Sequence, residues 1–177
     1  MRIISGRNKG RTLKAPKWDG LRPTSDKLRE TLFNIIAPHV MDARVLDVFA
    51  GTGAIALEAL SRGAAAATCI EQDRRAGQLI EANRALCGDE NRCAIIRDTV
   101  ERALARPVAG GPFDIIVLDP PYDYPALATA VRAAAGQRSP GAVLVLEHAA
   151  RVTPPVADGL TVTRTVTSGD SALSFYA

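Results

Sequence analysis

The residues that decide the fold are 44–54, which read RVLDVFAGTGA. The apolar run at 44–49 predicts a short buried strand, and Gly51 and Gly53 allow a tight turn directly after it. Residues 54–61 then have the composition of a helix that ends before another glycine. A strand, a glycine turn and a helix in this order predict a site where the backbone approaches a nucleoside-type ligand closely.

The same alternation of short apolar runs and amphipathic stretches continues along the chain. It predicts an α/β fold with a parallel sheet, because a helix connects each strand to the next parallel strand. The predicted strands are residues 44–49, 66–71, 93–96, 113–118 and 142–146. The predicted helices are residues 54–61, 74–86, 100–105 and 126–135, preceded by a helix at 25–36 that Pro38 ends.

The end of the chain departs from this alternation. Residues 160–166 and 172–176 both have the composition of strands, and only residues 167–171 separate them. So short a link allows a hairpin but not a parallel crossover, so the last strand is predicted to run antiparallel to the others. A parallel sheet closed by such a hairpin is typical of class I methyltransferases, whereas a dinucleotide dehydrogenase normally keeps its sixth strand parallel.

Length and composition predict one globular domain over residues 1–177. Of these residues 47% are hydrophobic, and no apolar run approaches the ~20 residues that a membrane span needs. The N-terminus lacks the apolar middle region of a secretory signal, so we expect a cytoplasmic protein with no membrane partner. The three cysteines have no CxxC spacing and no histidine nearby, which argues against a metal site or a disulfide framework. His39 and His148 have no acid or nucleophile partner in the sequence and are interpreted as structural.

Basic residues are concentrated at the start of the chain. The formal net charge is +3, yet the first 29 residues have a net charge of +7 and the remainder has −4. A basic arm on a mildly acidic body suits a polyanionic partner, because neutralised phosphates release condensed counterions. The alternative is a solvated, charged terminus. We interpret residues 1–24 as a basic extension of a core at 25–177.

Asp47, four positions before Gly51, indicates which cofactor the glycine turn binds. A carboxylate beside the ligand suits the ammonium group of a methionine moiety and is poorly suited to a pyrophosphate. The glycine spacing alone would also satisfy the dinucleotide fingerprint, so this carboxylate favours S-adenosylmethionine over NAD. Its alternative role is to cap the following helix or turn. The predicted cofactor contacts of the turn are Asp47, Phe49, Ala50, Gly51, Thr52 and Gly53.

Further carboxylates follow the second and third predicted strands. Glu71 lies roughly 20 residues after the glycine turn, where an acid commonly accepts hydrogen bonds from ribose hydroxyls. Asp98 and Thr99 are further predicted cofactor contacts. Asp98 could accept a hydrogen bond from an adenine amino group, or it could instead cap the helix that starts there. Asp73 is more simply interpreted as an exposed cap than as a ligand contact.

The segment Asp119-Pro120-Pro121-Tyr122 follows the predicted strand FDIIVL, so it lies at the carboxyl end of the fourth strand beside the cofactor crevice. An exocyclic amine on a nucleic-acid base is a poor nucleophile, because its lone pair is delocalised into the ring. The Asp119 carboxylate and the Pro120 carbonyl could accept the two amine protons and aim the lone pair at a methyl donor. They would also stabilise the positive charge that develops on the nitrogen.

The remaining residues of this segment fit the same chemistry. Each proline fixes its own φ and restricts the residue before it, so the acceptors are held rigidly. Tyr122 could stack on a target base that is flipped out of a helix or taken from a single-stranded loop. An ordinary turn after a strand is the alternative, since Asp and Pro are common turn residues. The position of Asp-Pro-Pro-Tyr two strand–helix units after the glycine turn favours an amine methyltransferase.

These segments together resemble the bacterial 16S ribosomal RNA guanine-N2 methyltransferases, and the similarity runs along nearly the whole chain. The glycine turn and the Asp-Pro-Pro-Tyr segment are each shared with other amine methyltransferases, whereas the joint pattern is specific. The matching stretches are residues 1–6, 9–11, 21–26, 29–34, 45–54, 57–63, 118–122 and 169–173.

The resemblance implies a class I S-adenosylmethionine-dependent methyltransferase fold of Rossmann-like type, with a mostly parallel seven-stranded sheet, an antiparallel last strand and an N-terminal β-hairpin. It implies methyl transfer to guanine N2 of 16S rRNA in the 30S subunit or its assembly intermediate, by a monomer that releases S-adenosylhomocysteine. It also implies that residues of the hairpin bind RNA, namely Arg2, Arg7, Lys9, Arg11 and Lys14. Three further residues are implied to lie near the cofactor or the base, namely Arg22, Thr24 and Asn34.

Three other functions fit parts of the pattern. A DNA or RNA adenine-N6 methyltransferase uses similar acceptors, although that class more often has Asn at the position of Asp119 and carries an added target-recognition domain. A non-catalytic RNA-binding module could retain the same fold. An oxidoreductase would use the glycine turn to bind NADH.

Overall fold

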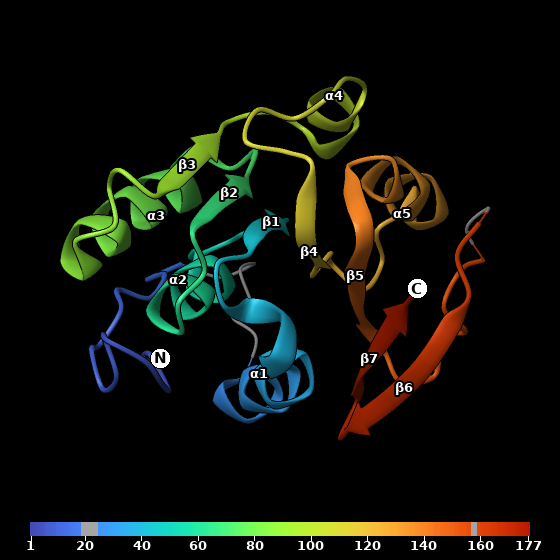
Figure 1. The fold of residues 1–177 in the computed structure, drawn as a ribbon, viewed down its shortest axis with the longest axis horizontal. Helices are drawn as coiled ribbons and strands as arrows, with labels where there is room; N and C mark the ends of the chain where they lie inside the picture. The colour runs from blue at the N-terminus through green and yellow to red at the C-terminus, as the bar shows by residue number, and fades with distance from the viewer. Residues whose placement is uncertain (19–24, 157–158) are drawn as a thin grey trace.

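The computed structural model describes residues 1–18, 25–156 and 159–177. At its centre is a seven-stranded sheet with the order β3-β2-β1-β4-β5-β7-β6 (Figure 1). The strands are β1 Arg44–Val48, β2 Ala66–Ile70, β3 Cys93–Ile96, β4 Phe113–Leu118, β5 Arg138–Ala149, β6 Val162–Ser168 and β7 Ser171–Tyr176. The helices are α1 Asp26–Val40, α2 Ala54–Ser61, α3 Arg74–Cys87, α4 Val100–Leu104 and α5 Leu127–Ala135.

Strands β1 to β5 are parallel, and β7 is antiparallel to both β5 and β6. The predicted mixed sheet with an antiparallel last strand is therefore confirmed. The link between β6 and β7 is only Gly169 and Asp170, and Gly169 has a φ of 61°. A two-residue turn with a positive φ joins adjacent antiparallel strands, which is why the chain cannot make another parallel crossover here.

Helices cover both faces of the sheet. On one face α1, α2 and α3 contribute Leu32, Leu60 and Ile80 to a buried cluster, and on the other face α4 and α5 contribute Leu104 and Val131 to a second cluster. Residues 115–118 of β4 alternate between these two clusters. Both faces of the central strands are thus buried, which explains why they read as continuous apolar runs in the sequence.

The prediction that Pro38 ends the first helix is wrong. Helix α1 begins after Ser25, whose side chain accepts the Leu28 N–H, and it contains Pro38 and continues to Val40. In the last turn of a helix a proline removes only one backbone hydrogen bond. The side chain of Val40 is 3% exposed, so one further buried apolar residue favours continuing the helix.

Strand β5 is longer than the predicted 142–146. It extends to Ala149, because β7 pairs with its last residues and satisfies their backbone groups. The register places Glu147 opposite Leu173. This extension keeps Glu147 in the sheet, beside the carboxyl end of β4.

The predicted N-terminal hairpin is present as an antiparallel bridge between Arg2 and Thr12. Ile3 N–H donates to the Arg11 carbonyl at 3.0 Å, and Ile3 is fully buried. The hairpin is fixed to α2, since the buried Glu58 carboxylate accepts the backbone N–H groups of residues 4 and 5 at 2.7 and 3.0 Å. The described part of the basic extension, residues 1–18, therefore packs against the sheet-covering helices and is not a detached arm. No helix in the described ranges is both long enough and apolar enough to cross a membrane.

Replacing Glu58 should loosen the hairpin. Glu58→Ala leaves two backbone donors without their acceptor and breaks the 2.7 Å ion pair with Arg62, so we expect the free energy of unfolding to fall by about 2–4 kcal/mol. Urea unfolding measures this loss, and hydrogen exchange should show faster exchange in residues 1–13. Glu90→Gln, at an exposed position of the same charge, is the matched control. Unchanged exchange in the hairpin would contradict the role of Glu58.

Candidate active site

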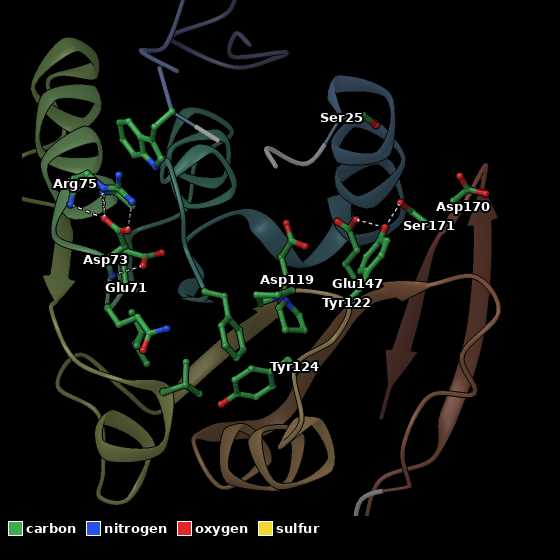
Figure 2. Close-up of a pocket in the computed structure, with 18 of the residues that line it drawn as sticks. Ser25, Glu71, Asp73, Arg75, Asp119, Tyr122, Tyr124, Glu147, Asp170 and Ser171 are labelled. Carbon is green, nitrogen blue, oxygen red and sulfur yellow. Dashed lines mark hydrogen bonds and ion pairs between the residues drawn. The ribbon is translucent and has the colours of Figure 1, made fainter. Parts of the chain in front are cut away.

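A cavity of about 780 Å³ lies at the carboxyl ends of the parallel strands (Figure 2). Phe49 follows β1, Glu71 follows β2 and Asp119 follows β4, and all three line it, together with Glu147 of β5. In an open α/β sheet this edge is where ligands bind. The cavity has Glu71 and Asp73 on one side and Asp119, Tyr122 and Glu147 on the other (Figure 2).

Glu71 connects the glycine turn to the loop that follows β2. One carboxylate oxygen, Oε2, accepts the Gly51 N–H at 2.8 Å, and the other accepts the Asp73 N–H at 2.7 Å. Only 9% of Glu71 is exposed, and this burial raises the pKa of its carboxyl group. A carboxylate has about four acceptor sites, so Glu71 retains the capacity to accept hydrogen bonds from hydroxyl groups in the cavity.

The glycine turn forms as predicted, with a conformation that restricts its sequence. Gly51 and Gly53 have φ values of 56° and 75°, and a Cβ on Gly53 would lie 3.1 Å from the Ile80 side chain. Phe49 also has a positive φ, 65°, which is strained for a residue with a side chain. Its ring lines the cavity and packs edge-on against Tyr124 at 4.8 Å. Ala50, Gly51, Thr52 and Gly53 shape the turn without being among the lining residues.

Asp47 lies behind this turn. It is 1% exposed and does not line the cavity, and its Oδ2 accepts the Ala56 N–H at 3.1 Å. The cap of α2, the alternative role considered for Asp47, is thus present as a hydrogen bond. The other oxygen, Oδ1, is buried and receives no hydrogen bond from the described residues. Burial is the main cause that raises the pKa of Asp47 well above its usual value.

Of Asp98 and Thr99, only Thr99 caps α4. Thr99 is the N-cap of α4 and accepts the Arg102 N–H at 3.4 Å, while Asp98 accepts the Thr99 N–H at 2.9 Å. Neither residue lines the cavity, whereas the next two residues, Val100 and Glu101, do. The structure therefore does not bring the Asp98 carboxylate to the predicted adenine position.

Asp73 caps α3 by accepting the backbone N–H groups of Arg75 and Ala76, as the simpler interpretation predicted. It also lines the cavity. The hydrogen bond from the Arg75 side chain lowers the pKa of Asp73 to about 2, so this carboxylate is ionised at neutral pH.

The predicted catalytic segment lines the cavity with all four residues. Asp119 N–H donates to the Val48 carbonyl at 3.2 Å, which continues the β1–β4 pairing beyond the end of β4. Pro121 accepts the Tyr124 N–H at 2.9 Å, so the prolines lie in a closed turn. The Tyr122 ring is 41% exposed, and its hydroxyl forms a 2.5 Å hydrogen bond with the Ser171 hydroxyl.

Glu147 is a cavity residue that the sequence did not predict. It is 6% exposed, and the Tyr122 hydroxyl donates to its Oε1 at 3.5 Å. Burial, followed by the charge of Asp119 and a hydrogen bond with it, raises the pKa of Glu147 to about 8. Two carboxyl groups can hydrogen bond to each other only if one carries a proton, so the pair holds a proton at neutral pH. The available signal was its position, since Glu147 directly follows the predicted strand 142–146.

Trp18 is a second cavity residue that the sequence did not indicate. The Arg75 guanidinium lies over its ring at 4.8 Å from the centroid. An aromatic ring covered by a guanidinium is a common surface for stacking a nucleobase. Nothing in the local sequence around Trp18 distinguishes it from an exposed residue in a basic segment.

The residues that the resemblance placed near the RNA, the cofactor or the base do not all lie at the cavity. Arg7 forms an ion pair with Asp89, and Arg11 donates to the Leu86 carbonyl, so both guanidinium groups lie against the end of α3. Arg2, Lys9 and Lys14 are exposed. Asn34 is exposed on α1 and does not line the cavity. Arg22 and Thr24 lie outside the described residues.

Within the part of the chain that the structure describes, no group of three or more His, Cys, Asp or Glu side chains is arranged to hold a metal ion. The cavity is acidic instead, with Glu71, Asp73, Asp119 and Glu147 around it. Such a cavity suits a positively charged or hydrogen-bond-donating ligand and disfavours a phosphate.

The family model for Conserved hypothetical protein 95 matches residues 1–177. The chain belongs to this family. Ribosomal RNA small subunit methyltransferase D of Escherichia coli strain K12 is 47% identical over 122 residues, which cover 69% of this chain and 60% of that protein. The chain thus matches less than two thirds of the length of that relative. YlbH of Bacillus subtilis is 37% identical over 99% of this chain and 98% of its own length.

Solved structures of similar proteins confirm the fold. The yhhF structure from Escherichia coli has a TM-score of 0.87 and 36% identity, and covers 99% of this chain and 96% of that one. SMU.776, a structure solved in complex with SAH, has a TM-score of 0.65 at 16% identity, covering 85% of this chain and 48% of that chain. The family member described here therefore has the class I S-adenosylmethionine-dependent methyltransferase fold.

The protonated Glu147–Asp119 pair should make stability depend on pH. A carboxyl group whose pKa is raised on folding contributes stability below its unfolded pKa, and that stability is lost as the pH rises through its folded pKa. We therefore expect the free energy of unfolding to fall more steeply between about pH 4.5 and about pH 8 in the natural protein than in Glu147→Gln. Urea unfolding at a series of pH values measures the difference. Glu90→Gln should follow the natural protein, and identical curves for all three proteins would contradict the raised pKa.

Proposed function

We propose that this protein transfers a methyl group from S-adenosylmethionine to the exocyclic N2 amine of a guanine in 16S rRNA. The observation that carries the proposal is the position of residues 119–122, Asp-Pro-Pro-Tyr. They line the same cavity as Glu71 and Phe49. An acceptor pair on a rigid turn lies there beside a site for a nucleoside-type cofactor. The names of the relatives, small-subunit rRNA methyltransferases among them, support the RNA substrate.

The residues of the cavity fit S-adenosylmethionine. Glu71 keeps acceptor capacity for the ribose hydroxyls, and Phe49 supplies an apolar ring beside them. The buried Oδ1 of Asp47, directly behind the glycine turn, has no donor among the described residues. An ammonium group near the turn would donate to it and favour the ionised carboxylate, which burial disfavours in the free protein. Bound there, the cofactor supplies an electrophilic methyl group. The backbone of residues 50–53 would form the close contact that the glycines allow.

The side chains opposite would hold the base. The Asp119 carboxylate and the Pro120 carbonyl accept the N2 protons, so the nitrogen lone pair points across the cavity. Tyr122, half-exposed at the rim, stacks on the base after it is flipped out of the RNA. As the bond from N2 to the methyl carbon forms, the bond from that carbon to sulfur breaks and sulfur keeps the electron pair. Asp119 stabilises the positive charge on the nitrogen, then accepts the proton that the nitrogen loses and passes it to solvent.

The RNA partner follows from the same proposal. The natural substrate would be 16S rRNA in the 30S subunit or an assembly intermediate, and G966 is the guanine we propose. A monomer suffices for this function, since every group named above comes from one chain. We propose that it acts in the cytoplasm, where ribosomal RNA is assembled into subunits. The exposed Arg2, Lys9 and Lys14 of the hairpin would contact phosphates.

Asp119→Ala should lower methyl incorporation into unmethylated 30S particles by at least about a hundredfold, because the amine loses its charged acceptor. The affinity for S-adenosylmethionine, measured by calorimetry, should change little. Asp123→Ala, an exposed acid in the same loop, is the control. Mass spectrometry of the digested RNA identifies the product, and N6-methyladenine in place of N2-methylguanine would favour the adenine alternative. Full methylation by Asp119→Ala would refute the mechanism.

Glu71→Gln should weaken the binding of S-adenosylmethionine. An amide offers one acceptor oxygen where the carboxylate offers two, so the variant loses either the Gly51 contact or the Asp73 contact and holds ribose hydroxyls less well. We expect the dissociation constant for S-adenosylmethionine to rise by about tenfold or more. Calorimetry measures it, with Glu90→Gln as the control. An unchanged constant would place the ribose elsewhere.

A further inference from the structure

Glu147 is a buried acid that the amine mechanism above does not use. It lines the cavity beside Asp119, on the neighbouring parallel strand, and the two carboxyl groups lie on the same side of the site (Figure 2). Its Oε2 is buried and receives no hydrogen bond from a donor of the described residues. No ion pair between Glu147 and a basic side chain occurs in the described ranges.

The fold does not explain this residue. The three preceding residues of β5, Val145 among them, are fully buried and apolar, and an apolar side chain at the same position would satisfy the sheet equally well. Burying a carboxyl group next to another carboxyl group costs free energy. A group that destabilises the free protein and is directed into a cavity is expected to have a partner in the bound state.

The remaining contacts of Glu147 fix its position. The Tyr122 hydroxyl donates to Oε1 and is itself hydrogen bonded to the Ser171 hydroxyl, as the dashed lines of Figure 2 show. These contacts hold the Glu147 carboxyl group beside Asp119, with which it shares a proton in the free protein. Oε2 has no hydrogen-bond partner among the described residues, so it can accept from a ligand once that proton has left. The adjacent His148 is bonded instead to Ser174 and to the Ala149 carbonyl, so it holds neither oxygen of Glu147.

Guanine presents a second donor next to its amine. The N2 amine is flanked by N1, which carries a hydrogen, and by N3, which is an acceptor. In adenine the N6 amine is flanked by N1, which is an acceptor, and by C5, and neither atom carries a polar hydrogen. A carboxylate next to the group that holds the amine therefore attracts guanine and repels the lone pair of adenine N1.

We propose that Glu147 selects guanine by accepting the N1–H of the base whose N2 amine is held by Asp119 and Pro120. This inference rests on the proposed function and adds a specificity-determining residue to it. Asp119, which follows β4, and Glu147, which lies within β5, then accept adjacent N–H groups of one base edge. The tyrosine and serine hydroxyls keep Glu147 in the orientation that presents Oε2 to N1.

The same arrangement predicts how binding depends on pH. In the free protein the carboxyl pair holds a proton, whereas N1–H and N2–H both require acceptors, so that proton must leave when guanine enters. The other acid near this side of the cavity is Asp170 in the β6–β7 turn, which is exposed. The kcat/KM for guanine should rise with pH as the pair loses its proton, and Glu147→Gln should move this limb of the profile to lower pH.

The test compares two bases that share the amine. 2-Aminopurine has the amine at C2 but no hydrogen on N1. We would reconstitute 30S particles from RNA with guanine or 2-aminopurine at the target position and measure kcat/KM for each with the natural protein, Glu147→Gln and Glu90→Gln. The natural protein and the control should prefer guanine by about tenfold or more, since one charge-assisted hydrogen bond is lost with the analogue.

In Glu147→Gln this preference should fall severalfold, because an amide can accept from N1–H or donate to an N1 lone pair. Calorimetry with S-adenosylmethionine and thermal unfolding establish that the variant is folded. Equal losses on both bases, or an unchanged preference, would overturn the selection of guanine by Glu147. A carboxyl group that kept its proton and donated it to N3 would give that result, because N3 is common to both bases.

Failure of the proposed function gives a different pattern. If the natural protein formed no N2-methylguanine on guanine-containing particles, the proposed function would be wrong and the inference would fall with it. If it formed N2-methylguanine and Glu147→Gln discriminated as well as the natural protein, only the inference would be wrong. A pH profile of Glu147→Gln that matches that of the natural protein would also show that only the inference is wrong.

Discussion

The register of the parallel strands determines where every polar residue of the cavity lies. Val48 of β1 pairs with Ile70 of β2 and with Leu118 of β4, so the three strands end level with one another. Backbone hydrogen bonds continue this register beyond the strands, since Asp119 N–H donates to the Val48 carbonyl and Ala50 N–H to the Ile70 carbonyl. The residues that follow the strands therefore form one row, and a one-residue slip of β4 would turn Asp119 away from the cavity. The two sides of the cavity, which the proposed function assigns to the cofactor and to the base, thus depend on the same hydrogen-bond ladder.

Much of this arrangement could be predicted because its causes are local. Continuous apolar runs between helices require a sheet buried on both faces, and the two-residue link at Gly169 leaves only a hairpin. The positions of Glu71 and Asp119 follow from that order. The roles of Asp47 and Asp98 could not be predicted, since a carboxylate in the strand or loop that leads into a helix can bind a ligand or a backbone N–H, and the choice depends on its side-chain orientation.

Other features depend on contacts between distant segments. Glu147 belongs to the cavity only because β7 pairs with the end of β5 and keeps that residue in the sheet. Pro38 stays within α1 because Val40 is buried against the core, a contact that no local pattern reveals. Tertiary packing in both cases outweighs the preference of the local sequence. The extent of β5 was therefore the error with the largest consequence for the site.

The charge distribution has a consequence for how an RNA substrate would bind. The cavity is lined by Glu71, Asp73, Asp119 and Glu147, whereas the basic residues are concentrated in the first 29 residues. Phosphates are repelled by such a cavity, but an uncharged base edge with several N–H donors is attracted to it. Under the proposed function only the base enters, and the sugar-phosphate backbone remains outside with the basic segment. Flipping the nucleotide out of the RNA separates its donor edge from its negative charge, which is the one geometry that satisfies both surfaces at once.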